Sequence, residues 1–186
     1  MEGIFMSNIL IISGHTDIQH SRANKIILEN LKNDFPNAEF NSLIELYPDY
    51  KFNIEAEQAK LLKADIIVLQ FPLFWFSCPS IMRKWFEDVL LHGFAYGTQG
   101  KALKEKKVIV AFTTGAPLDA YQYGGWENFD ISAFLPQFIQ LTNLCSMEWA
   151  GYVVSCGYSF VANDQKIKEL ADKHSYDLAE KIRNVM

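Results

Sequence analysis

The chain has 186 residues, of which 49% are hydrophobic and 21% are charged, and its formal net charge is −5. This length is typical of one domain with a packed core, so we expect a single domain over residues 1–186. No stretch approaches the ~20 apolar residues of a membrane span, and the acidic balance, without a basic stripe, argues against nucleic acid as a partner.

The N-terminal and cysteine patterns indicate the compartment. The first residues, MEGIFMSNILIISGH, carry no basic region and no small-residue cleavage site, so we read no secretory signal and expect a cytoplasmic protein. Cys78, Cys145 and Cys156 form no C-x-x-C pair, which disfavours a disulfide framework and a thiolate metal site. Cys78 precedes Pro79 at a predicted helix start, where a thiol pKa can be lowered, but we expect it to pack. No histidine has a partner four residues on, and no metal site is predicted.

Five apolar runs of strand length recur along the chain. They are Asn8–Ser13, Glu39–Leu43, Asp65–Phe71, Lys107–Thr113 and Trp149–Val154. The first, third and fourth are continuous and rich in β-branched residues, as strands covered on both faces are.

Segments of helical period separate these runs. One helix face is formed by Ala23, Ile26, Ile27 and Leu31, and another by Met82, Trp85, Phe86, Val89 and Leu90, with Trp85 and Phe86 expected in the core. A last helix is expected from Asp164 to Arg183, with Asn163 or Asp164 as its N-cap.

Strands that alternate with helices make right-handed βαβ units. The sequence therefore predicts an α/β fold, a doubly wound three-layer sandwich with a five-stranded parallel sheet. Ligands bind beyond the carboxyl ends of the strands in such sheets, so we look for function in residues 14–24, 71–79 and 113–127.

The first of these loops, GHTDIQHSRAN, has one glycine and is neither a dinucleotide loop nor a Lys-bearing P-loop. It opens onto a predicted helix N-terminus, where backbone N–H groups and the helix dipole attract a phosphate. Ser21 and Asn24 can add hydrogen bonds, and His15 and Arg22 can bring positive charge. Two alternatives stay open: Ser21 acts only as an N-cap, and His15 is only a turn residue bonded to backbone.

Four blocks together resemble the flavodoxin-like NAD(P)H:quinone oxidoreductases. QFPLFWFSCPSIMRKWFEDVLLHGFAYG is similar to their F-P-L-x-W-[FY] and G-[FW]-A-Y-G signatures, and GHTDIQHSRAN to their flavin-phosphate loop. LYPDYKFNIEAEQ resembles a segment of the bacterial branch, and TTGAPLDAYQYGG resembles the T-T-G-G…Y loop. The similarity spans nearly the whole chain. It looks strongest toward the bacterial quinone reductases that include the ancillary subunit of glutathione-gated potassium efflux systems and drug-activity modulators.

The resemblance implies a homodimeric flavoprotein with a flavodoxin-like fold that reduces quinones with NAD(P)H by ping-pong kinetics. It implies that the flavin phosphate lies on His15, Ser21, Arg22, Ala23 and Asn24. The isoalloxazine would meet Pro72, Leu73, Phe74 and Trp75 along one edge and Phe112, Thr113, Thr114 and Gly115 along another. Tyr121 would help stabilise the reduced flavin or the substrate, and Gly115 could bring its backbone close to the reduced ring. Two departures are that no histidine follows Tyr121 before Glu127, and that Ala116 replaces the second glycine.

Several alternatives remain at this stage. The short chain favours FMN over FAD, and the choice between NADH and NADPH is open. The protein could instead be a regulatory flavoprotein subunit of a potassium efflux antiporter, peripheral on the inner face of the membrane, or an azo or nitro reductase. An electron-carrying flavodoxin fits less well, because the aromatic loops are wide. Tyr121 could also be only an aromatic residue of a surface loop.

Overall fold

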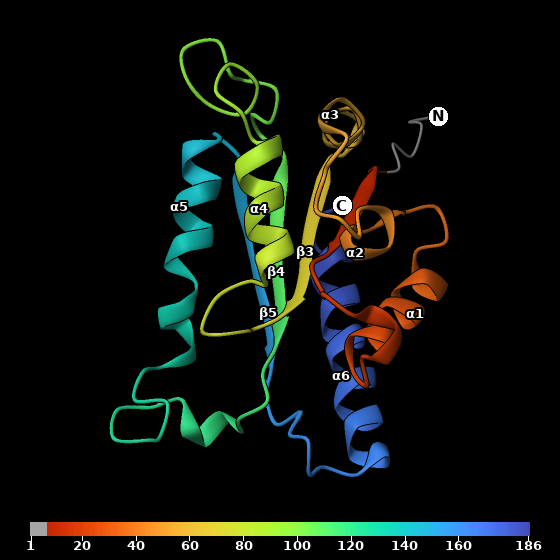
Figure 1. Ribbon diagram of the computed structural model, residues 1–186, viewed down its shortest axis with the longest axis vertical. Helices are drawn as coiled ribbons and strands as arrows, with labels where there is room; N and C mark the ends of the chain where they lie inside the picture. The colour runs from red at the N-terminus through yellow and green to blue at the C-terminus, as the bar shows by residue number, and fades with distance from the viewer. Residues whose placement is uncertain (1–6) are drawn as a thin grey trace.

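In the computed structural model, which describes residues 7–186, five parallel strands form one sheet in the order β2-β1-β3-β4-β5 (Figure 1). The strands are β1 (Ile9–Ser13), β2 (Glu39–Ser42), β3 (Ile66–Pro72), β4 (Lys107–Thr113) and β5 (Glu148–Ser155). The α-helices are α1 (Asn24–Asp34), α2 (Leu43–Leu46), α3 (Ile54–Lys63), α4 (Ser80–Val89), α5 (Pro136–Leu144) and α6 (Asp164–Arg183). The predicted α/β sandwich with a five-stranded parallel sheet is confirmed.

The predicted strands agree with this structure except at their ends. Leu43 is the clearest correction, since it begins α2 and does not extend β2. The sequence interpretation did not name α3 or α5. α5 starts with Pro136, whose fixed backbone angle suits the first turn of a helix. The predicted bounds of α6 are confirmed, and Asn163 caps it by accepting a hydrogen bond from the Lys166 N–H at 2.8 Å.

Helices cover both faces of the sheet and produce two buried clusters. In Figure 1, α5 lies to the left of the sheet and α4 in front of β4 and β5, while α1 and α6 lie to the right. The cluster under α4 and α5 includes Trp85 and Phe86, only 2% and 6% exposed, so their predicted core position is confirmed. The cluster under α1 and α6 includes Ile27 and Leu178, both at 0% exposure. β1 and β3 are buried along their whole length, and their alternating side chains contribute to both clusters, which explains their continuous apolar runs.

A buried carboxylate ties α3 to α4. Glu57 is fully buried and accepts a hydrogen bond from the Trp85 indole at 2.8 Å. Tyr47, Asn41 and Lys60 also donate to this carboxylate, so its charge is compensated inside the protein.

The three cysteines are free, and Cys78 and Cys145 are buried. Burial raises the pKa of the Cys78 thiol more than Arg83 lowers it, which confirms the packing role expected for Cys78. Within residues 7–186, no helix is both long and apolar enough to cross a lipid bilayer.

Candidate functional site

The loops that follow β1, β3, β4 and β5 border a cleft of about 430 Å³. These loops lie at the lower end of the sheet in Figure 1, where the parallel strands reach their carboxyl ends. The cleft is lined by His15, Asp17, His20, Ser21, Arg22, Ala23, Asn24, Pro72, Leu73, Phe74, Thr113, Thr114, Gly115, Tyr158, Phe160 and Ile167. Its volume falls in the range of roughly 300–1,000 Å³ that small-molecule sites occupy.

Ser21 and His15 shape the β1–α1 side of the cleft. The Ser21 hydroxyl accepts a hydrogen bond at 3.0 Å from the Asn24 N–H, the first N–H of α1, while it also lines the cleft; the N-cap position itself is Ala23. His15 Nδ1 accepts from the Asp17 N–H at 3.0 Å, as the turn alternative predicted. Burial lowers the pKa of His15, so the imidazole is neutral at pH 7. With Nδ1 accepting from Asp17, a neutral His15 offers its Nε2–H to the cleft, and its role toward a phosphate stays a prediction.

The protein already engages Arg22 through two strong contacts. Its guanidinium donates to the Asp164 carboxylate and to the Ala162 carbonyl, each at 2.7 Å. These bonds join the start of α1 to the start of α6 across the mouth of the cleft. An anion there meets a guanidinium that is shared with Asp164.

The β3–α4 and β4 loops supply the opposite walls. Phe74 lies edge-on to His15, with ring centroids 5.9 Å apart. Gly115 faces open space, since a Cβ built on it would have no neighbour within 4 Å. Backbone can therefore approach a ligand closely at Gly115.

Two predicted cofactor residues lie outside the cleft wall. Trp75 is 91% exposed, and its backbone has a left-handed φ of 49°. Phe112 is fully buried in the core, stacked on Phe71 with ring centroids 5.8 Å apart. The other predicted cofactor residues all line the cleft.

Tyr121 packs beneath its loop and does not line the cleft. It is 6% exposed, with its ring edge-on to Phe134 at 5.9 Å, so the alternative of a surface aromatic is wrong. Burial raises the pKa of Tyr121, whereas Thr114 acts in the opposite direction, and the phenol stays protonated at pH 7. The catalytic role of Tyr121 stays a prediction.

The sequence interpretation missed the lining residues that follow β5. Tyr158 and Phe160 come from the β5–α6 loop, and Ile167 comes from α6. The available signal was Gly157 and two aromatic residues directly after the fifth predicted strand. Asp17 and His20 also line the cleft, and they hydrogen-bond to each other at 2.9 Å.

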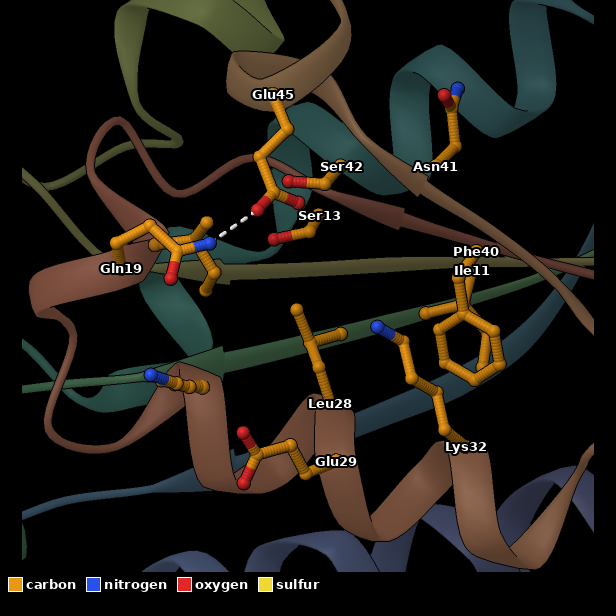
Figure 2. Close-up of a pocket in the computed structure, with 12 residues that line it drawn as sticks. Ile11, Ser13, Gln19, Leu28, Glu29, Lys32, Phe40, Asn41, Ser42 and Glu45 are labelled. Atoms are coloured by element: carbon orange, nitrogen blue, oxygen red, sulfur yellow. Dashed lines mark hydrogen bonds between the residues drawn. The ribbon is translucent and has the colours of Figure 1, made fainter.

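Figure 2 shows a second hollow, of about 140 Å³, beside β1, β2 and α1. Its charges balance, since Lys25 and Lys32 face it together with Glu29 and Glu45. The Gln19 amide donates to the Glu45 carboxylate across one end at 2.5 Å. This hollow is smaller than ordinary cofactor sites, so the larger cleft is the candidate functional site.

A doubly wound parallel sheet with a cleft at its carboxyl ends and a helix N-terminus on one wall defines the class of α/β proteins that bind phosphate-bearing ligands there. Comparison with known proteins identifies the family. The family described as "Flavodoxin-like fold" matches residues 7–177, and the chain belongs to this family.

Relatives agree with this assignment. The chain is 38% identical over 173 residues to a glutathione-regulated potassium-efflux system ancillary protein, KefF, of Klebsiella aerogenes, covering 89% of this chain and 92% of that protein. General stress protein 14 of Treponema denticola, solved in complex with FMN, is similar with a TM-score of 0.84 and 28% identity, covering 94% of this chain and 99% of that one. An NADPH-quinone reductase of P. pentosaceus is similar with a TM-score of 0.77 and 27% identity, covering 92% and 97%.

Proposed function

We propose that this protein is a flavin-dependent NAD(P)H:quinone oxidoreductase with FMN as its cofactor. The cleft carries the proposal, because one space of about 430 Å³ joins a helix N-terminus to an open glycine. The similarity to an FMN-bound protein and to an NADPH-quinone reductase supports the same choice.

The residues present fit a flavin mononucleotide. Ser21, Arg22, Ala23 and Asn24 at the start of α1 would hold the phosphate, with the His15 Nε2–H as an added neutral donor. Pro72, Leu73 and Phe74 would border one edge of the ring, and Thr113, Thr114 and Gly115 the other. Neither Trp75 nor Phe112 lines the cleft. Trp75 would therefore contribute only through the conformation of the β3–α4 loop, and Phe112 only through the packing of the core beneath Thr113.

Bound FMN would supply a centre that takes a hydride from NAD(P)H and passes it to a quinone, so that NAD(P)⁺ and hydroquinone are formed with one proton from solvent. The protein would orient the two flat substrates in turn against Leu73 and Phe74 and exclude water there. Gly115 would bring its backbone close to the negative charge that develops on the ring. The Tyr121 phenol, which lies outside the cleft wall, would stabilise that charge through the cleft residue Thr114, with which it interacts.

An anaerobic titration tests this proposal. Purified protein is mixed with NADPH, or NADH in a parallel run, and then with menadione, while flavin absorbance is followed and the released flavin is identified by chromatography. We expect bleaching by the nicotinamide and full recovery on adding the quinone. Protein that neither carries FMN nor takes it up contradicts the proposal. Replacing menadione with an azo dye or a nitro compound tests the alternative acceptors.

The homodimer also belongs to this proposal. Trp75, Tyr123 and Trp126, in the loops that follow β3 and β4, are at least 78% exposed. The left-handed backbone of Trp75 and Phe76 costs roughly 1–2 kcal/mol per residue, which contacts with a second copy would offset. Light scattering should give twice the chain mass, and Trp126→Ser should shift the protein toward the monomer.

A second candidate function is that of a cytoplasmic ancillary subunit of a potassium-efflux antiporter at the inner face of the membrane. The 38% identity to a potassium-efflux system ancillary protein, over nearly the full length of both chains, favours it. Co-purification with antiporter-containing membranes, and potassium efflux that depends on this protein, would support it. Normal reductase activity without either effect would leave the enzyme as the whole function.

A further inference from the structure

A buried hydrogen-bond network runs beneath the cleft and connects side chains from distant parts of the sequence. The network consists of Tyr158, Ser155, His174, Gln70, Asn24 and Thr113. His174 and Gln70 are fully buried, and Asn24 and Thr113 are 2% and 3% exposed. Both ends of the network, Tyr158 and Thr113, line the cleft.

Each neighbouring pair in the network lies at hydrogen-bonding distance. Tyr158 Oη lies 2.9 Å from Ser155 Oγ, which lies 2.7 Å from His174 Nδ1. His174 Nε2 lies 3.0 Å from Gln70 Oε1. Gln70 Nε2 donates to Asn24 Oδ1 at 2.9 Å, and Asn24 Nδ2 donates to Thr113 Oγ1 at 3.1 Å.

With the two amides oriented as they lie in the structure, the direction of every bond follows. Gln70 Oε1 can only accept, so His174 Nε2 must carry a proton. Burial lowers the pKa of His174 to about 4, so the ring is neutral at pH 7 and Nδ1 is an acceptor. Ser155 must then donate to Nδ1, which leaves the Ser155 oxygen to accept from the Tyr158 hydroxyl.

The direction has opposite consequences at the two ends. Thr113 Oγ1 accepts from Asn24, so its own hydrogen is available to an acceptor atom in the cleft. The Tyr158 hydrogen is used on Ser155, so its oxygen offers only lone pairs to a donor atom in the cleft. In a low-dielectric interior, aligned bonds strengthen one another.

We propose that His174, a residue that does not line the cleft, is a positioning residue that holds the two amides in this orientation and so keeps Thr113 a hydrogen-bond donor and Tyr158 an acceptor. The consequence for ligand binding rests on the proposed function, with FMN as the ligand whose acceptor atom would meet Thr113. The network itself does not rest on it.

The first measurement is a long-range ¹H–¹⁵N spectrum of protein labelled at histidine, at pH 7, with the His174 signals assigned by their loss in His174→Gln. We expect a neutral ring protonated at Nε2. A ring protonated at Nδ1 would reverse every bond and overturn the proposal, and so would a charged ring. This result is independent of flavin binding and of activity.

The second measurement compares FMN dissociation constants and absorption maxima. His174→Leu removes both ring nitrogens, and we expect roughly tenfold weaker binding and a shifted flavin spectrum, the effect of about one lost hydrogen bond. His174→Gln keeps an amide donor for Gln70 and should bind within about threefold of wild type. Ile182→Ala also removes a fully buried side chain from α6, but outside the network.

Wild-type affinity in His174→Leu, or an equal loss in Ile182→Ala, would overturn the positioning role. If the wild-type protein binds no FMN, the proposed function fails. The spectrum still shows which ring nitrogen of His174 is protonated, and so still tests the network. If His174→Leu does not fold, the spectrum of the wild-type protein still decides the direction of the bonds.

Discussion

Acidification from pH 7 to pH 5 should destabilise this protein through His174. The imidazole has a pKa near 6.5 when exposed in the unfolded chain. In the folded protein burial lowers the pKa of His174 to about 4, and the small effects of Asp177 and Lys173 oppose each other. Gln70 and Ser155, which contact the ring from other elements, carry no charge.

The sign follows from proton binding. Because the folded pKa lies below the unfolded one, the unfolded state binds more protons below pH 6.5, and stability falls as the pH falls toward 4. Between pH 7 and pH 5 the two pKa values give a loss of about 2 kcal/mol. Asp17, Asp130 and Asp172, whose pKa values are lowered from 3.8, lose their stabilising effect below this window.

Urea unfolding at pH 7 and at pH 5 measures the effect. In His174→Gln the difference between the two free energies of unfolding should shrink by about 2 kcal/mol. His15, whose pKa burial also lowers, contributes in the same direction in both proteins and cancels. His92→Gln replaces an exposed histidine and should keep the full difference. If His174→Gln loses as much stability as wild type on acidification, His174 is not the neutral buried group described above.

Three further predictions concern the cleft and its support. Tyr121→Phe should lower quinone turnover by about 10- to 100-fold with little change in FMN content, and unchanged turnover would remove Tyr121 from the mechanism. Gly115→Ala should weaken FMN binding while the free energy of unfolding stays within about 0.5 kcal/mol of wild type, whereas Gly14→Ala, whose new methyl would lie 2.9 Å from the Met82 Cβ, an atom fixed to the helix backbone, should destabilise the fold itself in urea unfolding. Glu57→Gln should lower the free energy of unfolding by about 1–3 kcal/mol, because the new amide faces donors that now bind a carboxylate; equal urea midpoints would contradict this.

The strands and their order of appearance could be read from the sequence, because a strand covered on both faces is a continuous apolar run. The loops at the carboxyl ends followed from that fold, and most predicted cofactor residues do line the cleft. Phe112 shows that a motif does not reveal which of its side chains line the cleft. Successive side chains in a strand point to opposite faces, so when Thr113 points to the cleft, Phe112 points into the core.

Other features had no readable signal. Trp75 belongs to the same motif as Phe74, but a left-handed backbone turns it outward, and no sequence rule predicts that conformation for tryptophan. His174 lies in the middle of a helix, where a histidine gives no indication of burial. Its partners come from β3 and β5, so only the packed structure shows the network.

The position of α6 explains why a residue so distant in sequence can act on the cleft. α6 holds α1 along its whole length, because Arg22 donates to Asp164 at 2.7 Å at one end and Arg183 donates to Asp34 at 3.1 Å at the other. Between them, the Asn30 amide donates to the Ser175 hydroxyl at 2.9 Å. The predicted phosphate loop lies at the start of α1, and α6 holds α1 in place. α6 is also the helix that carries His174. A displacement of α6 would therefore change both the position of the phosphate loop and the hydrogen-bond direction at Thr113. A variant that loosens the contact between α1 and α6 should alter both features of the cleft together.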